Sequence, residues 1–499
     1  MKISNILIAN RGEIAVRIMK TADRLGIKTT VIKTASEPSA MYLSLAGEVY
    51  DDTENISEIP VFLDIDRIIS IALQSGADAI HPGYGFLAEN PYFAQKCADN
   101  NIIFIGPSPD SIYKMGNKTI ARKIALAKNI PMATGSEGQV PAWKDAVRVA
   151  ARIGYPVIIK AASGGGGRGM RIVRKEEEMQ QMFRLASNEA EKAFSDPSVF
   201  IEKYIENPRH IEFQILGDKS GNIIHLGERE CSVQRKHQKL LEEAPSPALN
   251  QELRKEMGEI SVKIASAVGY YSAGTVEFLF DSDGKYYFME MNTRIQVEHP
   301  VTEFITGIDI IEEQIRIAEG RKLRHAQKDI KLKGWAFECR INAEDVQSGF
   351  SPAPGKIDKI IMPAGDNIRV DTGVQAGSVI AANFDSMIAK LIVYGKDRKD
   401  ALANCKQALD KVWIKGTKTT LPFFRMLIRN NRFLEGSITT SFIENELDSY
   451  VNSDYEELLA AWLATWLFAG ENLDESNLKI DIEEARNLSP WLLNKRIGR

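Results

Sequence analysis

The chain has 499 residues, which is too long for a single hydrophobic core and predicts three or four domains. With 44% apolar residues, 26% charged residues, a formal net charge of −4 and no dense Lys/Arg run, the composition argues against a nucleic-acid partner. The sequence offers no signal-peptide core and no apolar run of the roughly 20 residues that span a membrane, so we expect a cytoplasmic protein without a membrane partner. The cysteines form no CxxC pair, which fits reduced thiols, and they are Cys97, Cys231, Cys339 and Cys405.

The N-terminal part alternates short apolar runs with segments of helical spacing. The predicted elements are strands at residues 5–10, 28–32, 79–81 and 102–105 and helices at 12–25 and 66–74. Because this is a β-α-β start that continues in the same alternation, we predict a doubly wound α/β domain over residues 1–115.

A glycine-rich stretch follows at residues 160–173, which read KAASGGGGRGMRIV and satisfy the dinucleotide-binding pattern GxGxxG. That pattern requires a helix after the glycines, because the helix N-terminus holds the pyrophosphate. Here strand character precedes and follows the glycines, and no Gly-Lys-Ser/Thr closes a Walker loop. We therefore predict a hairpin whose glycine tip is a flexible lid over phosphates, with Lys160 on the adjacent strand as a point charge.

The lid and a helical linker that contains Gly116-Asn117-Lys118 together span residues 116–204. From residue 205 the pattern becomes rich in strands, which predicts an antiparallel sheet with helices on one side over residues 205–330. The strands expected there are 210–216, 222–226, 274–280 and 286–292. The residues after 449 predict a helical tail, with helical spacing at 458–468.

The last two of these strands flank a turn-rich segment and predict a β-hairpin. If Asp281 pairs with Tyr286, then Glu277 lies directly opposite Glu290, an arrangement of like charges that is uncommon without a cation between them. Asn292 lies two residues beyond Glu290 and thus on the same face of the strand. We predict that these two carboxylates and the amide hold Mg²⁺. A solvated charged face is the alternative, which the methionine and aromatic residues of the hairpin disfavour.

The segment EMNTRIQVE places a polar residue at every second position from Glu290 to Glu298. If it is extended, it forms one polar ribbon that continues from the metal site. Such a ribbon could hold a small planar anion and remove a proton from it, with Glu298 as the candidate base. The neighbouring His299 could compete for that role or could equally be a structural histidine.

Residues 228–239, ERECSVQRKHQK, would by themselves be interpreted as a surface charge run. A nucleophilic Cys231 is the weaker interpretation, because no partner can be assigned to it. His210 has no local ligand spacing, so a core or surface position is favoured for it when it is considered alone.

Taken together, several motifs resemble biotin carboxylase of the ATP-grasp superfamily from residue 3 to about residue 445. They are HPGYGFLAEN, KAASGGGGRGMRIV, EKYIENPRHIEFQIL, ERECSVQRKHQK, GTVEFLF, MEMNTRIQVEHPVTE, ECRINAED and FDSMIAKL. The resemblance implies a multidomain α/β and α+β fold with ATP-grasp lid and central domains, a biotin carboxylase C-terminal domain over residues 331–448 and then the tail at 449–499. It also implies ATP-dependent carboxylation of biotin on another domain, with bicarbonate activated as carboxyphosphate and Mg²⁺, or Mn²⁺, as the metal.

The resemblance carries roles to matching residues of this sequence. It agrees with the hairpin argument on Mg²⁺, and the residues it implies for the nucleotide are Lys118, Lys160, Gly164, Gly165, Gly166, Gly167, Met170, Glu202, Lys203, Ile205, His210, Gln234, His237 and Leu279. For bicarbonate it implies Lys239, Arg294, Gln296 and Val297, with Glu298 as the base.

On the biotin side, the resemblance implies that Arg340 binds bicarbonate and then stabilises the biotin enolate, while Tyr84 lines the biotin pocket. The sequence departs from the usual pattern at residues 37–50, which lack the histidine and Ala-Asp-Glu common there, and at Phe384, where tyrosine is frequent. Neither departure removes a group that takes part in the chemistry.

Two other hypotheses stand beside a biotin carboxylase: another ATP-grasp carboxylate ligase and a silent nucleotide-binding subunit. RIQVEH together with ECRINAED disfavours the first, and the complete set of motifs disfavours the second. We expect the subunit of an acyl-CoA carboxylase, with a two-subunit pyruvate carboxylase as the alternative. Because no Met-Lys-Met occurs, we expect biotin on a separate biotin carboxyl carrier protein, carboxyltransferase subunits as further partners, and a homodimer.

Overall fold

A computed structural model gives the fold and describes residues 2–451 except 56, 58, 163–168, 195 and 383. Contacts between residues divide the chain into two units, Met1–Asn445 and Glu446–Arg499. The predicted helix at 458–468 lies outside the described residues. Within the described part of the chain, none of the helices is both long and apolar enough to cross a membrane.

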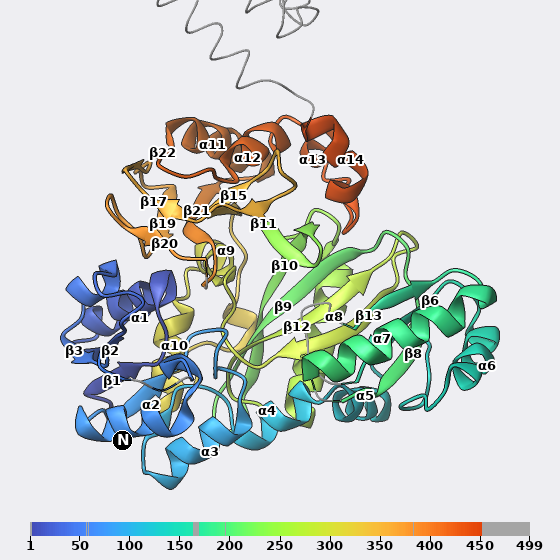
Figure 1. Ribbon diagram of the computed structural model, residues 1–499, viewed down its shortest axis with the longest axis horizontal. Helices are drawn as coiled ribbons and strands as arrows, with labels where there is room; N and C mark the ends of the chain where they lie inside the picture. The colour runs from blue at the N-terminus through green and yellow to red at the C-terminus, as the bar shows by residue number, and fades with distance from the viewer. Residues whose placement is uncertain are drawn as a thin grey trace, which may run out of the picture. The chain divides into compact units, whose positions relative to one another are not determined.

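The N-terminal domain is a parallel sheet of five strands with helices on both faces (Figure 1), as predicted for a doubly wound domain. Its strand order is β3-β2-β1-β4-β5. Its elements are β1 (Asn5–Ile8), α1 (Gly12–Arg24), β2 (Lys28–Lys33), β3 (Glu48–Asp51), α2 (Ile65–Gln74), β4 (Ala79–His81), α3 (Pro91–Asp99) and β5 (Ile103–Phe104). Alternate residues of β1 face different cores, since Ile6 packs with α1 and Leu7 with α2 and α3. The edge strand β3 was not predicted, because its residues are only half-buried or exposed.

The lid has a three-stranded sheet, and its hairpin is confirmed. Strand β6 (Val157–Ala161) pairs with β7 (Arg171–Val173) in antiparallel register and with β8 (Val199–Lys203) on its other side. Helices α6 (Trp143–Ile153) and α7 (Met179–Phe194) pack on this sheet. The predicted glycine contacts 164–167 lie outside the described residues.

An antiparallel sheet of eight strands forms the centre of the first unit. Its order is β13-β12-β9-β10-β11-β14-β21-β19. The bounds are β9 (Arg209–Gly217), β10 (Ile223–Arg235), β11 (Gln238–Ala244), β12 (Ser272–Phe280), β13 (Tyr286–Asn292), β14 (Trp335–Asn342), β19 (Ile368–Thr372) and β21 (Met387–Gly395). The predicted boundary at residues 330/331 therefore lies between β11 and β14, two hydrogen-bonded strands of one sheet.

Helices cover both faces of this sheet, so the prediction of helices on one side is wrong. Phe213 of β9 packs with α8 (Gln251–Ala267), whereas Leu216 of the same strand packs with α10 (Ile310–Ala318). The sequence of β9 alternates polar and apolar residues from His210 to Ile215, as a half-solvated strand does, but its polar residues are buried as well.

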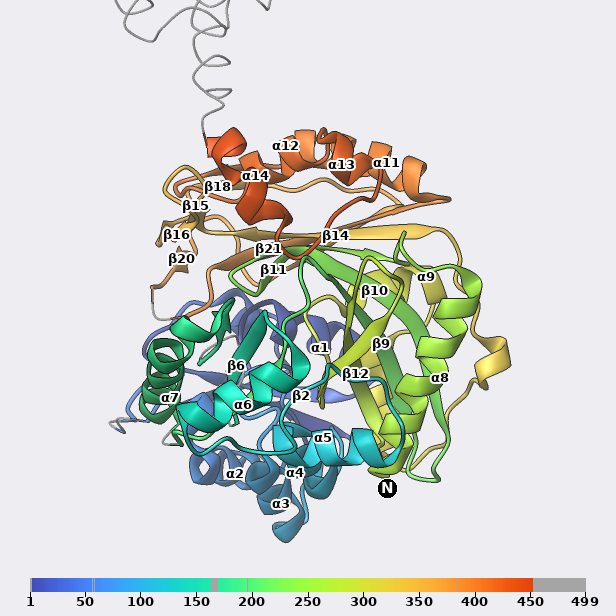
Figure 2. The ribbon, with the colours of Figure 1, turned by 90° about the vertical axis from the view of Figure 1, so that its right-hand side faces the viewer.

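The C-terminal helices α11 (Arg398–Lys411), α12 (Leu421–Leu427) and α13 (Asn431–Leu434) lie over β14 and β21 in Figure 2. Cys339 of β14 lies 3.9 Å from Cys405 of α11, sulfur to sulfur. The remaining helices and strands are α4 (Pro109–Gly116), α5 (Lys118–Ala127), α9 (His299–Thr306), α14 (Phe442–Val451), β15 (Glu344–Asp345), β16 (Ser351–Pro352), β17 (Gly355–Lys356), β18 (Lys359–Ile361), β20 (Val379–Ile380) and β22 (Trp413–Lys415).

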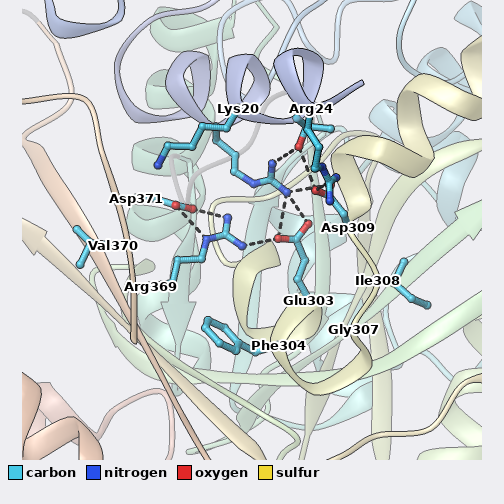
Figure 3. A pocket seen from close by; sticks show the side chains of 12 residues that line it. Lys20, Arg24, Glu303, Phe304, Gly307, Ile308, Asp309, Arg369, Val370 and Asp371 are labelled. Atoms are coloured by element: carbon cyan, nitrogen blue, oxygen red, sulfur yellow. Dashed lines mark hydrogen bonds and ion pairs between the residues drawn. The ribbon is translucent and has the colours of Figure 1, made fainter. Parts of the chain in front are cut away.

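A buried to half-buried group of ion pairs joins the N-terminal domain to the large sheet (Figure 3). Arg17 of α1 donates to Glu303 and Asp309, each at 2.9 Å. Arg369 of β19 donates to Glu303 at 2.6 Å and to Asp371 at 2.9 Å. These five residues, here called the junction cluster, line a cavity of about 490 Å³ together with Lys20, Thr21, Arg24, Phe304, Gly307, Ile308 and Val370.

Candidate active site

The hairpin of β12 and β13 places Glu277 directly opposite Glu290, which confirms the predicted pairing. The register next to the turn differs from the prediction, because Phe280 rather than Asp281 pairs with Tyr286. A β-bulge after Glu277 supplies the missing residue and restores the register. Two carboxylates therefore face each other on one sheet surface.

The polar ribbon does not remain extended, so that prediction is wrong beyond Asn292. Strand β13 ends there, and a loop leads to α9, whose N-cap residue is Glu298 with φ −81° and ψ 11°. Pro300 lies in the first turn of α9, where its fixed φ favours a helix start. The polar residues of the loop nevertheless converge on the hairpin, since Gln296 Nε2 donates to Glu277 Oε1 at 2.8 Å.

The centre of the site is an ammonium group among three carboxylates. Lys239 Nζ donates to Glu212 Oε2 and Glu298 Oε1, both at 2.6 Å, and to Glu277 Oε1 at 3.2 Å. Arg340 Nη2 donates to the second oxygen of Glu298 at 2.8 Å. We call these five residues the catalytic cluster. The sequence predicted four of them, whereas Glu212 was missed.

Charge in this region divides the carboxylates into two kinds. Burial alone would raise the pKa of Glu277 and Glu298, but Lys239 holds the pKa of both well below the ordinary value, with help from His210 and Arg340 respectively. Burial, followed by the charge of Glu277, raises the pKa of Glu290. The hairpin thus presents one firmly ionised carboxylate beside one that resists ionisation without a further cation.

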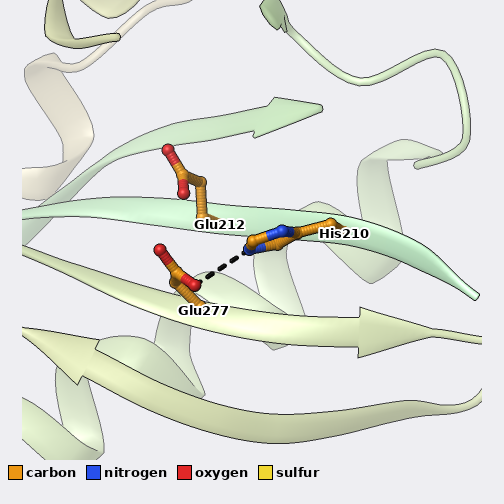
Figure 4. A group of neighbouring side chains, drawn as sticks. All are labelled: His210, Glu212 and Glu277. Carbon is orange, nitrogen blue, oxygen red and sulfur yellow. Dashed lines mark hydrogen bonds and ion pairs between the residues drawn. The ribbon is translucent and has the colours of Figure 1, made fainter. Parts of the chain in front are cut away.

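The carboxylate oxygens of Glu277 and Glu212 suit a hard divalent cation. His210 Nε2 lies 3.0 Å from Glu277 Oε2, and ligand atoms of His210, Glu212 and Glu277 all lie within 4.8 Å of one another (Figure 4). Asn292 lies beside them, but its Nδ2 donates to Glu277 at 2.8 Å while its Oδ1 accepts from Arg294 at 3.2 Å. Its amide oxygen therefore faces Arg294 in this arrangement.

The charge run 228–235 is part of the buried strand β10, so its interpretation as a surface segment is wrong. Arg229 is fully buried and donates to Glu212 at 2.5 Å and to Gln296 Oε1 at 2.7 Å. It therefore orients one member of the catalytic cluster and one predicted bicarbonate ligand. Its charge is paired, which is how a charged residue becomes part of a core.

The residues predicted for the nucleotide lie on the lid and on the facing strands. Lys160 Nζ donates to Glu202 at 2.6 Å, whereas Lys203 Nζ donates to the backbone oxygen of Tyr155 at 2.9 Å. Lys118 opens α5, and burial lowers its pKa. His237 lies between β10 and β11 with φ 64°.

Other members of this set are placed by the sheet. Leu279 pairs with His210 across β12 and β9. Gln234 Nε2 lies 3.4 Å from His210 Nδ1. Ile205 and Met170 are half-buried.

Tyr84, which was predicted to line a biotin pocket, connects toward the loop before α9 through buried groups that the sequence did not reveal. The hydroxyl of Tyr84 donates to Glu13, and Lys390 Nζ lies 3.1 Å from Glu13 Oε1. Lys390 also donates to the backbone oxygen of Val297 at 2.9 Å. At the position of the tyrosine-to-phenylalanine departure, the guanidinium of Arg11 lies 4.2 Å from the ring centre of Phe384.

Glu89 was also missed, although it belongs to the quoted motif HPGYGFLAEN. It accepts from Arg294 Nε at 2.8 Å and thereby links the N-terminal domain to the loop before α9. Of the competing groups, Cys231 is buried, which raises its pKa well above the ordinary value and disfavours a thiolate nucleophile. Burial lowers the pKa of His299 well below the ordinary value, and its Nδ1 lies 2.8 Å from the Gln296 backbone oxygen.

Three family models match the chain. They are described as "Biotin carboxylase, N-terminal domain" over residues 2–112, "Carbamoyl-phosphate synthase L chain, ATP binding domain" over 117–326 and "Biotin carboxylase C-terminal domain" over 338–445. The chain is 50% identical to biotin carboxylase 1 of Bacillus subtilis across 89% of this chain and 98% of that protein. It is 49% identical to a pyruvate carboxylase subunit of Methanothermobacter thermautotrophicus, across 88% of this chain and 89% of that protein.

A solved structure agrees with these matches. The biotin carboxylase domain dimer of Hydrogenobacter thermophilus 2-oxoglutarate carboxylase, crystallised with MgADP, ADP and bicarbonate, has a TM-score of 0.87 at 47% identity, across 90% of this chain and 99% of that one. The expected α/β and α+β fold is thereby confirmed. With its fold, its motifs and its relatives in agreement, the chain belongs to the biotin carboxylase family of ATP-dependent ligases.

Proposed function

We propose that the protein carboxylates biotin on a separate carrier protein at the expense of ATP, with bicarbonate activated as carboxyphosphate. The observation that carries the proposal is the position of Glu298, whose two oxygens contact Lys239 and Arg340. A carboxylate held between two cations is ionised and lies where a small anion and its proton can be received. The related structure with MgADP and bicarbonate supports the same substrates.

Magnesium, or manganese in its place, would be held by Glu277, Glu290 and Asn292 and would neutralise charge on the transferring phosphoryl group. The raised pKa of Glu290 beside Glu277 supports this, because a cation between the two carboxylates removes their repulsion. Asn292 would need to present its oxygen in place of its nitrogen.

We assign bicarbonate to Lys239, Arg294, Gln296 and the backbone of Val297. Arg229 orients Gln296 and Glu89 orients Arg294, so both side chains are fixed before the anion arrives. Glu298 then takes the proton of bicarbonate as the general base. His299 is the weaker base, because its Nδ1 is already engaged with a backbone oxygen.

For the second half of the reaction we assign Arg340 to the developing negative charge on biotin and Tyr84 to the pocket wall. Phosphates of ATP are assigned to the lid glycines, Lys118, Lys160 and His237, with Glu202, Lys203, His210 and Gln234 around the nucleotide and Met170, Ile205 and Leu279 beside its apolar parts. Lys160 is held by Glu202 in the present arrangement and would exchange that contact for phosphate.

The proposed partners are a biotin carboxyl carrier protein, carboxyltransferase subunits and a second copy of this chain. A 50% identical relative is named biotin carboxylase 1, and the given sequence contains no Met-Lys-Met; both support a carrier on another polypeptide. We propose an acyl-CoA as the final acceptor; pyruvate is the second candidate, because a 49% identical relative is a pyruvate carboxylase subunit. The four free cysteines support a cytoplasmic location.

The test is phosphate release from ATP by the purified protein. We expect slow hydrolysis that requires Mg²⁺ and bicarbonate and that free biotin stimulates. Glu290→Gln should raise the Mg²⁺ concentration needed for half-maximal rate. Hydrolysis indifferent to both bicarbonate and biotin would contradict the proposed function, and an unchanged Mg²⁺ requirement would contradict the metal assignment alone.

A further inference from the structure

Two buried glutamates face each other behind Arg340. Glu242 of β11 and Glu338 of β14 are directly opposite in the antiparallel ladder, and both are fully buried. Directly opposite residues place their side chains on the same face about 5 Å apart. Like charges in that position are destabilising, so this pair requires an explanation.

The next row of side chains across the same sheet carries positive charge. Arg340 lies opposite Lys390 on β21, and both lie two residues from the row that contains Glu338. Two acids in one row are therefore compensated diagonally by two bases in the next. Arg340 Nη2 contacts both Glu242 and Glu298, so a single guanidinium edge connects the acid pair to the proposed base.

The pair is poorly supplied with hydrogen-bond donors. Among the described residues, Glu242 Oε2 and both oxygens of Glu338 are buried without a hydrogen-bond partner. A buried ionised oxygen without a donor is costly, and two adjacent ones are more so. A proton between the carboxyl groups would remove one charge and supply one donor at the same time.

We propose that Glu242 and Glu338 share one proton and together act as positioning residues that hold Arg340 against Glu298. This inference rests on the proposed function for the role of Arg340 and Glu298. The single negative charge that remains on the pair holds the guanidinium from behind. A second charge there would draw Arg340 away from Glu298, and a fully neutral pair would release it.

The charged groups around the pair support this state. Arg340 and Lys239 favour ionisation of Glu242, whereas burial and Glu298 oppose it, and the result raises the pKa of Glu242 to about 7. Burial, Glu242 and Glu298 raise the pKa of Glu338 well above the ordinary value in spite of Lys390 and Arg340. Because Glu242 and Glu338 lie directly opposite each other, the shared proton is assigned to the pair and not to either residue.

The experiment compares Glu242→Gln, Glu338→Gln and the control Glu243→Gln in the full chain. Glu243 lies on the same strand and is equally buried, but it faces the other side of the sheet and pairs with Arg398. Infrared difference spectra at about pH 6 report protonated carboxyl groups. We expect each pair variant to lose one carboxyl C=O band, because the remaining glutamate ionises beside its cation, and the control to keep that band.

Turnover gives the second readout. Glu242→Gln should lower the biotin-dependent kcat by about 10- to 100-fold with little change in the KM for ATP, because a charge-assisted contact to Arg340 is lost. Glu338→Gln should cost less, since an amide resembles a protonated acid, and should remove an inflection from the plot of kcat against pH.

Persistence of the carboxyl band in both pair variants would overturn the shared proton. Should Glu242→Gln fail to fold, Glu338→Gln decides alone, because the band must vanish there as well. The infrared result does not require catalysis. A wild-type protein without bicarbonate-dependent ATP hydrolysis would therefore refute the proposed function and leave the spectral test of the pair intact.

Discussion

The junction cluster and the catalytic cluster are both buried networks of ion pairs, but they treat their carboxylates differently. At four residues of the junction cluster, attraction outweighs burial and favours the charged form: the pKa values of Arg17 and Arg369 are raised, and those of Asp309 and Asp371 are lowered. Every one of these shifts stabilises the paired state.

Around the catalytic cluster the pKa shifts of the carboxyl groups differ in direction. The pKa values of Glu277 and Glu298 are lowered, while burial and neighbouring carboxylates raise those of Glu290, Glu242 and Glu338. The nearby cations therefore do not offset the burial and mutual repulsion of Glu290, Glu242 and Glu338. The comparison supports the proposed roles: the ion pairs of the junction cluster offset one another, whereas the carboxylates around the catalytic cluster would be stabilised by a bound cation or by protons.

The largest expected effect is that of Glu298→Gln. Removing the proposed base should lower bicarbonate-dependent turnover by about 10²- to 10⁴-fold while nucleotide binding stays unchanged. Steady-state kinetics and ADP titration calorimetry measure the two quantities. A near wild-type rate would return the base assignment to His299.

A smaller effect, on stability instead of turnover, is expected for Glu303→Gln in the junction cluster. This change leaves Arg17 and Arg369 without half of their counter-charge, so the free energy of unfolding should fall by about 3 kcal/mol. Urea unfolding measures this loss, and turnover of the folded enzyme should persist. A large loss of turnover with unchanged stability would contradict the view that the junction cluster stabilises the fold and takes no part in catalysis.

The smallest expected effect is a difference in how the two clusters respond to pH. Burial opposes but Arg369 lowers the pKa of Asp371 from 3.8 to about 2, so its stabilisation is present above about pH 4 and is lost as the pH falls toward 2. The pKa of Glu242 is raised from 4.5 to about 7, so its contribution is present below about pH 4.5 and is lost as the pH rises through 7.

Thermal unfolding of two variants tests these signs. Relative to wild type, Glu338→Gln should gain stability between about pH 5 and 7.5, by on the order of 1 kcal/mol, because the strained pair is gone. The deficit of Asp371→Asn should shrink below about pH 4. Parallel curves for the two variants would mean that the clusters do not differ in protonation.

Local patterns predicted the elements that depend on neighbouring residues. The βαβ start, the lid hairpin and the pairing of Glu277 with Glu290 follow from alternation and turn residues within a few positions. The bulge after Glu277 could not be predicted from the sequence. It offsets the one-residue error in the register predicted at Tyr286, so the predicted pairing of Glu277 with Glu290 is still correct. The turn before α9 was missed because a polar residue at every second position is compatible with a loop as well as a strand.

Contacts between distant segments could not be predicted from the sequence. Arg17 and Glu303 are separated by 286 positions, and nothing local to either indicates the other. From the sequence alone, Arg229 and Glu338 would be predicted at the surface, because charged residues are rarely buried. In the folded sheet, both are buried near groups of opposite charge. Register across β11 and β14, which places Glu242 opposite Glu338, depends on a pairing of strands almost a hundred residues apart.

The continuous sheet has a consequence for the lifetime of an unstable intermediate. Lys239 on β11 and Arg340 on β14 stand on adjacent strands, which are held about 4.8 Å apart. Under the proposed roles, activation of bicarbonate and transfer to biotin take place over a distance set by one strand spacing. Although Lys239 and Arg340 fall in the ranges of two different family models, the activated carboxyl group would therefore move within one continuous sheet, which shortens the time in which water can intercept it.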